Sequence, residues 1–507
     1  MLLRNAWYIG AWADELGDKP LARRICGDPV VLFRDGSGRA AALADRCCHR
    51  AAPLHLGSLV EAGIQCGYHG LVFDTIGRCV AIPGQKLIPQ DAQVRSYPSV
   101  ERDQLVWLWM GDPALADPAR IVDFPYHNDT AHWPNKHAVY PIKGNYMLMV
   151  DNLMDLTHLG YLHAKTVGGN PAAHVEAEMK TIRTPTGVKF TRWMRNSVQP
   201  PTYVKAAGFT GRVDRWQEFE FVAPSSVLQW TGAADAGPGA YEGKRDSGFQ
   251  FRLFHGLTPE TEISCFYFWS VANGYRQNEP ETTEQLYREI APTFVEDRVM
   301  VEAQQARLGE FGEAGLVDIA SDATRMQMRR MVERLIVDQQ SAVAAEQTLF
   351  LTLARRFFEH RETAPARLLH DGLAEQAHHP WQVDFDADEF VQHLDRPGDR
   401  LPHRHGAKIQ AVLVPAIVES AHQASKFGAN AADPAVEPAL RLFRAEPMRD
   451  RNDQRLGHRM APPAGSERAD TVGYMGQNRR GAWRDVGLTV RGGDARTEVF
   501  EPRGAGP

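Results

Sequence analysis

The sequence predicts an α+β protein: an all-β N-terminal domain, then a domain of antiparallel sheet and helices, then a poorly ordered C-terminal extension. Three observations predict this fold class. Short strand-like runs separated by turns fill the first 110 residues, longer strand-like runs alternate with two helix-like stretches up to about residue 345, and sustained hydrophobic periodicity is lost after that point. With 507 residues the chain has room for two or three domains, because single cores rarely grow past about 250–300 residues.

The N-terminal domain is expected to span residues 1–111. Residues 29–35 (PVVLFRD) and 39–45 (RAAALAD) read as strands joined by a Gly-Ser-Gly turn, and the apolar, aromatic run 105–112 (LVWLWMGD) reads as the strand that closes the domain. The segment that follows is rich in Pro and Asp, which favours a linker over residues 112–125.

The second domain is expected over residues 126–345, where strand patterns and helical patterns are mixed. Its predicted strands include 225–230, 249–257 and 262–271, and its predicted helices are 144–163 and 282–308. This mixture is typical of an antiparallel sheet flanked by helices.

The C-terminal extension, residues 346–507, has a different composition. It is rich in Arg, Ala, Pro and His, and it holds a helix-like stretch near 346–358 and an isolated apolar patch at 411–418. From residue 446 onward Arg, Gly, Asp and Pro dominate, which is typical of disorder. No motif occurs in this part of the sequence, and a misread reading frame is one simple explanation of it.

The overall composition excludes several classes of function. The net charge of −6 gives no reason to expect a nucleic-acid or membrane partner, and no run approaches the roughly 20 apolar residues of a membrane span. The start of the chain lacks the long apolar run of a signal peptide, so we expect a cytoplasmic protein. Six cysteines in so long a chain do not make a disulfide framework, and three of them lie close together beside histidines, which favours a metal site.

The cysteines near residue 50 form the first chemical motif. Cys47-x-His49 is followed by sixteen residues and then by Cys66-x-x-His69, so each half supplies one thiolate and one imidazole. Two such loops side by side place both cysteines on one iron and both histidines on the other. That is Rieske-type ligation of a [2Fe–2S] cluster, in which neutral histidines raise the reduction potential.

A structural zinc site is the alternative for these residues. Zinc sites usually space Cys from Cys and His from His by two to four residues, whereas Cys and His alternate here, which favours the cluster. Cys48 lies inside the motif but not at a ligand position, and we expect it to be a buried free thiol.

A second motif, Asp155-x-x-His158-x4-His163, lies on the first predicted helix. At about 100° per residue all three side chains fall within an arc of roughly 140°. The two histidines are the ends of that arc, so binding one metal requires a bend between them. Two histidines and a carboxylate make the facial triad of O₂-activating Fe(II) sites.

The missing carboxylate is predicted from helical phase. In the second predicted helix Asp297 falls on the apolar stripe, whereas its neighbour Glu296 points to the opposite side. A carboxylate on a buried face is costly unless it is paired or bound to metal, so Asp297 is the expected third ligand. The alternative is that the histidines are ordinary core residues and Asp297 a buried ion-pair partner. A cluster upstream weakens that alternative, because a one-electron donor needs an acceptor.

Together these segments resemble the Rieske non-haem iron aromatic oxygenases, in particular the vanillate O-demethylase-like branch. The resemblance rests on RNAWYIGAWADEL, CGYHGLVFD, NLMDLTHLGYLH and FVEDRVMVEAQ, and it covers roughly residues 1–340. It implies a Rieske domain followed by a helix-grip catalytic domain with mononuclear Fe(II), arranged as a head-to-tail homotrimer. It also implies that Asp155 accepts hydrogen bonds from His69 of a neighbouring subunit and from His158, and that Asn152 lies near the iron.

The resemblance further implies O₂-dependent hydroxylation or O-demethylation of an aromatic substrate, expected to be an aromatic acid. Electrons would come from NAD(P)H through a separate flavin and iron–sulfur reductase. The sequence has no GxGxxG unit to bind the dinucleotide, which agrees with a separate reductase. The expected substrate contacts are His255 and Phe268, with Phe266 and Trp269 as further candidates.

Two other classes of protein stay open. A Rieske electron-transfer protein would carry the cluster without mononuclear iron at His158, His163 and Asp297, and a zinc-stabilised binding module would carry neither. Iron and zinc analysis distinguishes the three.

Overall fold

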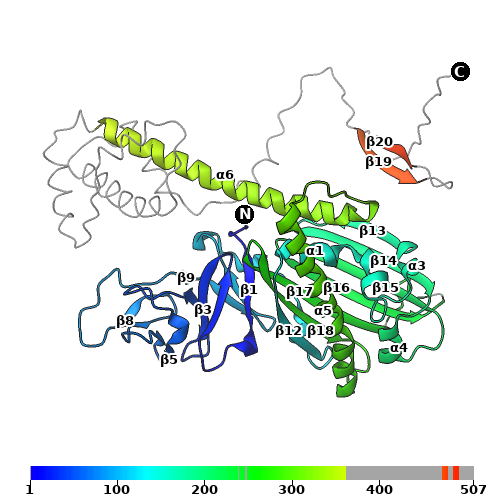
Figure 1. The fold of residues 1–507 in the computed structure, drawn as a ribbon, viewed down its shortest axis with the longest axis horizontal. Helices are drawn as coiled ribbons and strands as arrows, with labels where there is room; N and C mark the ends of the chain where they lie inside the picture. The colour runs from blue at the N-terminus through cyan, green and yellow to red at the C-terminus, as the bar shows by residue number, and fades with distance from the viewer. Residues whose placement is uncertain (1, 238, 246–247, 361–470, 478–482, 490–507) are drawn as a thin grey trace. The chain divides into compact units, whose positions relative to one another are not determined.

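The computed structural model describes residues 2–237, 239–245, 248–360, 471–477 and 483–489 (Figure 1). The chain divides into two compact units, Met1–Val383 and Asp384–Pro507. Both predicted domains fall within the first unit, and their boundaries at residues 111, 125 and 345 stay predictions.

The N-terminal part is all-β, as predicted. A three-stranded sheet has the order β1 (Trp7–Trp12), β11 (Leu105–Trp109), β10 (Ser99–Arg102). Two four-stranded sheets have the orders β2 (Leu21–Ile25), β3 (Asp28–Arg34), β4 (Ala40–Ala44), β9 (Ser96–Tyr97) and β5 (Ser58–Val60), β6 (Gly63–Gln65), β7 (Val72–Phe73), β8 (Cys79–Ala81). All five residues of β11 are buried, because aromatic and β-branched side chains fill the space between the layers.

A seven-stranded antiparallel sheet forms the second part. Its order is β12 (Asn135–Ile142), β18 (Ser264–Asn273), β17 (Phe249–Thr261), β16 (Ser226–Asp235), β15 (Val213–Val222), β14 (Gly187–Ser197), β13 (Glu178–Arg183). The helices of this unit are α1 (Tyr146–Met154), α2 (Leu159–Leu162), α3 (Pro171–Val175), α4 (Pro201–Ala207), α5 (Pro280–Phe311) and α6 (Ala323–His360).

The two faces of the sheet pack against different partners. On β17, Phe251 and Leu253 face helices α1 and α5 in the main core, whereas Phe254 lies in a cluster with Trp7 and Trp107 of the N-terminal sheets. Strand alternation therefore gives one face to the helices and the other face to the N-terminal domain (Figure 1).

The predicted helix over residues 144–163 is broken at Asp155, before His158, whereas the histidine spacing predicted a bend between His158 and His163. Helix α1 ends at Met154, a 3₁₀ turn spans Leu156–His158, and α2 begins at Leu159. The predicted helix over residues 282–308 is confirmed as part of α5.

Helix α6 crosses the predicted boundary at residue 345 and includes the helix-like stretch at 346–358. In the second unit, β19 (Thr471–Gln477) and β20 (Trp483–Thr489) pair as an antiparallel hairpin, which the sequence analysis did not expect. The apolar patch at 411–418 and most of the extension predicted to be disordered lie outside the described residues. Of the helices that the structure describes, none combines the length and apolar character needed to cross a bilayer.

Candidate functional site

The break after α1 positions Asp155. Its backbone is extended (φ −131°, ψ 103°), and its side chain accepts a hydrogen bond from the N–H of Thr157, so Asp155 ends one helix and caps the next turn. The chain then makes a 3₁₀ turn to His158 and one α-helical turn to His163. Both imidazoles face Asp297 from this segment.

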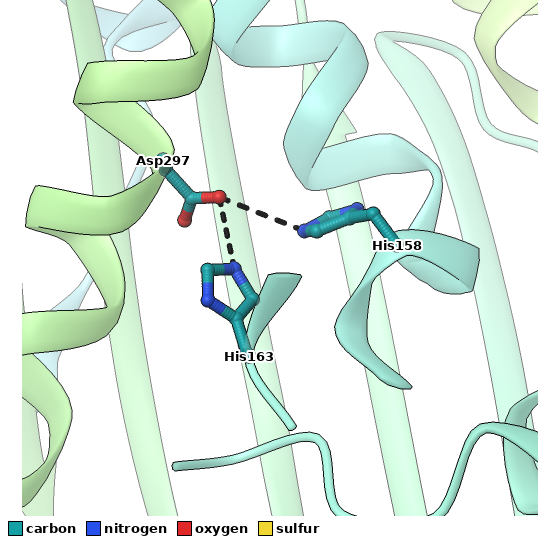
Figure 2. A group of neighbouring side chains, drawn as sticks. All are labelled: His158, His163 and Asp297. Atoms are coloured by element: carbon teal, nitrogen blue, oxygen red, sulfur yellow. Dashed lines mark hydrogen bonds and ion pairs between the residues drawn. The ribbon is translucent and has the colours of Figure 1, made fainter. Parts of the chain in front are cut away.

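His158, His163 and Asp297 converge on one point (Figure 2). One ligand atom from each residue lies within 4.8 Å of the other two. The Oδ1 atom of Asp297 lies 2.9 Å from Nε2 of His163 and 3.6 Å from Nε2 of His158. Asp297 is 2% exposed and His163 is 1% exposed. Two imidazoles and one buried carboxylate that face a common point provide the donor set of a mononuclear Fe(II) site.

Two more side chains hold this group in place. Nδ2 of Asn152 donates to Oδ1 of Asp297 over 2.8 Å, so Asn152 lies beside the expected metal position. Nδ1 of His163 donates to Oε2 of Glu296 over 2.7 Å. The prediction that Glu296 points away from the site is wrong, because its long side chain reaches back to the ring edge that faces away from Asp297.

The electrostatics follow from these contacts. Burial lowers the pKa of His158. Burial also lowers the pKa of His163, but the hydrogen bonds to Asp297 and Glu296 outweigh burial, and the pKa rises above its usual value. A carboxylate on Nδ1 fixes the tautomer and leaves Nε2 free to face a metal, which is a common support for metal-binding histidines.

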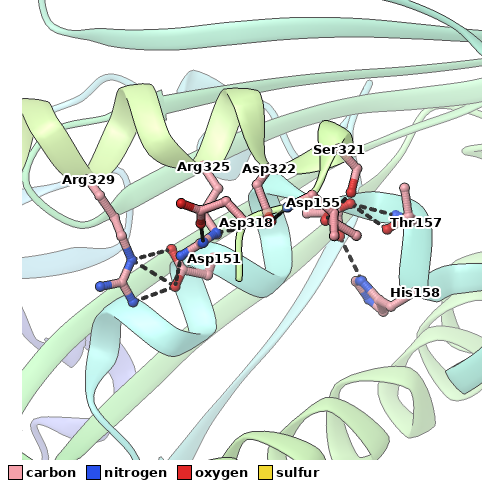
Figure 3. A network of polar contacts seen from close by, with 10 residues as sticks. Asp151, Asp155, Thr157, His158, Asp318, Ser321, Asp322, Arg325 and Arg329 are labelled. Atoms are coloured by element: carbon pink, nitrogen blue, oxygen red, sulfur yellow. Dashed lines mark hydrogen bonds and ion pairs between the residues drawn. The ribbon is translucent and has the colours of Figure 1, made fainter. Parts of the chain in front are cut away.

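Asp155 is held by its own loop and by the segment before α6 (Figure 3). Its Oδ1 accepts hydrogen bonds from the N–H and hydroxyl of Thr157 at 2.9 and 2.7 Å, and its Oδ2 accepts one from the hydroxyl of Ser321 at 3.1 Å. The expected bond from His158 goes to the main-chain carbonyl of Asp155 (2.7 Å) and not to the carboxylate. A carbonyl can only accept, so Nδ1 of His158 carries the proton and Nε2 faces the site.

The same network ties α6 to α1. Asp151 on α1 accepts hydrogen bonds from Nε of Arg329 at 3.0 and 2.9 Å and from Nη2 at 2.5 Å, and Arg325 lies 3.7 Å away (Figure 3). These ion pairs fix the position of Ser321 relative to Asp155, because α6 begins two residues after Ser321.

The cluster motif lies on two loops with the same hydrogen-bond pattern. In the first loop the N–H of Cys47 donates to the carbonyl of Ala52, and the N–H of Ala51 donates to the carbonyl of Cys47. In the second loop the N–H of Cys66 donates to the carbonyl of Leu71, and the N–H of Gly70 donates to the carbonyl of Cys66. Both residues at the fourth position, Ala51 and Gly70, have positive φ.

The ligands divide by burial as Rieske coordination requires. Both cysteines are 2% exposed and belong to one core cluster, whereas the exposed rings of His49 and His69 lie 4.5 Å apart. A thiolate pair and an imidazole pair on facing loops fit a [2Fe–2S] cluster with one iron buried and one at the surface. The expectation that Cys48 is buried is wrong, because the thiol is free and exposed.

A cavity lies between the sheet and helices α1 and α5, and the three converging residues form part of its wall. Its polar wall includes Asn152, Arg215, Gln217 and Gln229.

The predicted substrate contacts do not line this cavity. Phe268, like Phe266, lies in the cluster on the opposite face of the sheet, against the N-terminal domain. His255 is fully buried behind the wall, where it bonds the Tyr267 hydroxyl (2.7 Å) and Gln229 (3.0 Å), and burial lowers its pKa to about 3. Trp269 faces the helices but does not reach the cavity either. The cavity is lined by residues of β15, β16 and β17, whereas the predicted contacts lie on β17 and β18.

Comparison with known families matches both parts of the chain. Residues 6–98 match the Rieske [2Fe-2S] domain, and residues 142–338 match the vanillate O-demethylase oxygenase C-terminal domain.

Individual relatives agree with these matches. The chain is 41% identical over 346 residues, 68% of its length, to the full length of a putative toluene-4-sulfonate monooxygenase system iron-sulfur subunit from Comamonas testosteroni. It is 37% identical to a vanillate O-demethylase oxygenase subunit from a Pseudomonas species, over 68% of this chain and 98% of that one. The structure of dicamba monooxygenase bound to 3,6-dichlorosalicylic acid superposes with a TM-score of 0.63 at 36% identity, covering 67% of this chain and 99% of that one.

Proposed function

The chain belongs to the Rieske non-haem iron oxygenases of the vanillate O-demethylase type, as an oxygenase component, and from this premise we propose its reaction. It uses O₂, and electrons that a reductase takes from NAD(P)H, to hydroxylate or O-demethylate an aromatic substrate. The observation that carries the proposal is the convergence of His158, His163 and Asp297 on the wall of a cavity. A Rieske electron carrier needs neither the three ligands nor the cavity.

The residues divide into two metal sites. Cys47, His49, Cys66 and His69 would hold the [2Fe–2S] cluster, and His158, His163 and Asp297 would hold mononuclear iron. When bound, the two centres supply one-electron transfer and O₂ activation.

The surrounding side chains orient these ligands. The carbonyl of Asp155 and the carboxylate of Glu296 each accept the Nδ1 proton of one histidine, which turns both Nε2 atoms toward the same point. Asn152 donates to Asp297 and so holds one carboxylate oxygen on that point. The apolar side chains of Phe219, Leu253 and Phe294 line the rest of the cavity.

Demethylation and hydroxylation are the same chemistry on different carbons. Insertion of one oxygen atom into a methoxy C–H bond gives a hemiacetal that releases formaldehyde, whereas insertion at a methyl or ring carbon gives a stable alcohol or phenol. Which outcome occurs depends on the carbon that the cavity holds nearest to the metal.

Two exposed surfaces support a head-to-tail homotrimer, in which the cluster of one subunit serves the iron of its neighbour through Asp155. Around the exposed cluster histidines, Leu56 is 70% and Tyr68 62% exposed. Beside Ser321 and Asp155, Leu316, Val317 and Ile319 are 63–80% exposed. Apolar patches of this kind mark interaction surfaces. Electron supply from an NAD(P)H-dependent flavin and iron–sulfur reductase also favours a cytoplasmic location.

Metal analysis and turnover test the proposal together. The purified protein should contain two cluster irons and one mononuclear iron per chain, and with a cognate-type reductase it should consume NADH and O₂ when aromatic substrates are added. Formaldehyde release from methoxyarenes distinguishes demethylation from ring hydroxylation. Two irons per chain with no substrate-dependent O₂ uptake would establish an electron carrier, and bound zinc would establish a binding module.

A further inference from the structure

A buried arginine without a carboxylate partner lies in the wall of the cavity. We propose that Arg215, with the amide of Gln217, binds the anionic group of an aromatic acid, a carboxylate or a sulfonate, and so selects acids over neutral aromatic compounds. The inference rests on the proposed function and names the part of the site that recognises the substrate.

Strand alternation points Arg215 into the cavity. Arg215, Gln217 and Phe219 are successive residues on one face of β15, and all three line the cavity, whereas Trp216 and Glu218 between them face the other way. Arg215 is 3% exposed and Gln217 is 2% exposed. Both polar groups therefore lie in the interior with access only to the cavity.

The hydrogen-bonding capacity of Arg215 is largely unused. Among the described residues it makes one hydrogen bond, from Nη2 to the carbonyl of Val167 at 2.8 Å, and its guanidinium stacks over the ring of Tyr203 at 4.8 Å. Its Nε is buried without a hydrogen-bond partner in the described structure. None of the ion pairs in the described part of the chain includes Arg215, whereas Arg245, from a neighbouring loop, pairs with Glu218 at 2.6 Å.

Gln217 adds a second unsatisfied group at the same place. Its Oε1 is buried and has no hydrogen-bond partner within the described residues. An amide can rotate to present its NH₂ group instead of its oxygen, so Gln217 can donate to an anion held by Arg215. Two unsatisfied polar groups, two residues apart on the same face of one strand, are expensive in an apolar interior unless a ligand completes them.

The local charge also favours an anion. Arg192 on β14 is buried to 3% exposure, and the nearby positive charge of Arg215 contributes to lowering its pKa to about 10, after the larger effect of burial. Arg192 is engaged with the carbonyl of Leu156 (3.0 Å) and with His174, and it does not line the cavity. Two guanidinium groups close together make this end of the cavity positive, and only Arg215 is placed to contact a ligand.

The position of Arg215 relative to the metal ligands fits substrate orientation. Its partner Val167 lies in the turn that follows His163, where the N–H groups of Thr166 and Gly168 both donate to the carbonyl of His163. An acid anchored at Arg215 has its ring against Phe251 and Phe294, in the same cavity as His158 and Asp297. The anion thus fixes which ring substituent faces the metal.

Ligand binding without turnover tests the proposal. We would titrate benzoate, benzenesulfonate and benzamide into the holoprotein by calorimetry, without reductase or NADH. Benzamide matches benzoate in shape but lacks its charge. The wild-type protein should bind at least one of the two anions about 10- to 100-fold more tightly than benzamide, the range expected for hydrogen bonds to a charged group. The preferred anion shows whether the subsite suits a planar or a tetrahedral group.

Variants separate recognition from structure. Arg215→Met should remove the preference for the anion while leaving benzamide affinity within about twofold, and Arg215→Lys should keep part of the preference. Arg252→Met is the matched control, because Arg252 lies on β17 of the same sheet, also has an unpaired buried Nε within the described structure, and does not line the cavity. The Arg252→Met variant should bind the anions as tightly as the wild type does.

Equal affinity of the wild type for all three ligands, no measurable binding of either anion, or an unchanged preference in Arg215→Met would overturn the proposal. A failed oxygenase assay with intact anion preference would overturn the proposed function alone, because binding is measured without turnover.

Discussion

At the scale of single residues, the site depends on two carboxylates that are neighbours in the chain. Asp297 contacts Nε2 of His163, and Glu296 contacts Nδ1 of the same ring. Successive residues on a helix point about 100° apart, so only the shorter side chain lies in the core and the longer one reaches the ring from the rim. Glu296 is accordingly 38% exposed along its side chain, against 3% for Asp297.

The two carboxylates should therefore differ in their effect on iron. Asp297→Ala should lose the mononuclear iron and activity while the visible spectrum of the cluster is kept. Glu296→Gln should keep the iron but bind it about 10-fold more weakly, because support from outside the ligand shell typically changes metal affinity by 10- to 100-fold. Iron titration of the reconstituted protein measures both effects. Equal loss of iron in the two variants would show that Glu296 is itself a ligand.

Asp155 should affect turnover more than metal content. Within the described residues the carboxylate of Asp155 contacts no candidate ligand side chain, and it is held by Thr157 and Ser321. Asp155→Asn should retain both metals and lower turnover about 100-fold, and Ser321→Ala should lower it less than about 10-fold, since the two bonds to Thr157 remain. Metal content and substrate-dependent O₂ uptake measure the two quantities. Wild-type turnover in Asp155→Asn would exclude a role in coupling the two sites.

Sequence reasoning found the residues whose chemistry is unusual for their position. A carboxylate on the apolar stripe of a helix pointed to Asp297, which the structure places beside His158 and His163. The phase difference between the two histidines predicted a bend between them, but the helix is interrupted at Asp155, before both. Sequence reasoning missed Arg215, which lies in a stretch of the strand where polar and charged residues occur on both faces. Alternation alone does not say which face of a sheet is covered by helices, and the same limit led to the choice of Phe268, which faces the N-terminal domain.

At the scale of elements, the packing of α6 on α1 sets the surroundings of Asp155. Asp151 is half-buried between the two helices, and Arg329 makes three hydrogen bonds to it. Sequence patterns could not predict this pair, because its members are 178 positions apart and each fits an ordinary helix surface.

Arg329→Met should destabilise the protein, because it leaves the Asp151 carboxylate with only the more distant Arg325. Removing one partner of a buried pair costs about 3–5 kcal/mol, and partial exposure with the remaining arginine should reduce this to about 1–3 kcal/mol. Arg330→Met, at an exposed position on the same helix, should stay within about 0.5 kcal/mol of the wild type. Urea denaturation measures both, and equal stabilities would show that the ion pair is energetically neutral.

At the scale of the whole molecule, a buried histidine joins the N-terminal domain to the sheet. His127 is fully buried; its Nδ1 donates to the carbonyl of Asp103, and its Nε2 accepts from the hydroxyl of Ser270 on β18. Burial lowers the pKa of His127 to about 4. Since the unfolded chain has a histidine pKa of about 6.5, only the unfolded state binds this proton between pH 6.5 and 4, and stability falls as the pH falls through that window.

The contribution of His127 should be visible as a pH-dependent difference between variants. Each pH unit below 6.5 should remove about 1.4 kcal/mol, so the stability gap between the wild type and His127→Gln should shrink by about 2 kcal/mol from pH 7.5 to pH 5. Urea denaturation at both pH values measures the gap, and the other buried histidines cancel because both proteins have them. A gap that does not change with pH would mean that the pKa of His127 is the same in the folded and the unfolded protein.

The C-terminal limit of the catalytic unit follows from the contacts of α6. Oε1 of Gln339 accepts hydrogen bonds from the N–H groups of Arg4 and Asn5, both at 2.8 Å, and Leu335 and Ile336 pack against the core of the N-terminal domain. A full-length relative aligns with only 346 residues of this chain, so the shared fold is complete without the remaining extension. The sequence predicted the end of the catalytic domain at residue 345 and the end of the family resemblance near residue 340, and these contacts lie just before both positions.

Two truncations on either side of these contacts test the limit. A chain that ends at Ala342 keeps all of them and should fold, bind both metals and turn over like the full chain. A chain that ends at Arg334 loses two apolar side chains and two hydrogen bonds, together about 3 kcal/mol, and exposes the N-terminal core. Limited proteolysis should degrade the shorter chain first. If the chain ending at Ala342 is insoluble or loses its oligomer, residues beyond 342 are part of the working enzyme and the extension is a domain in its own right.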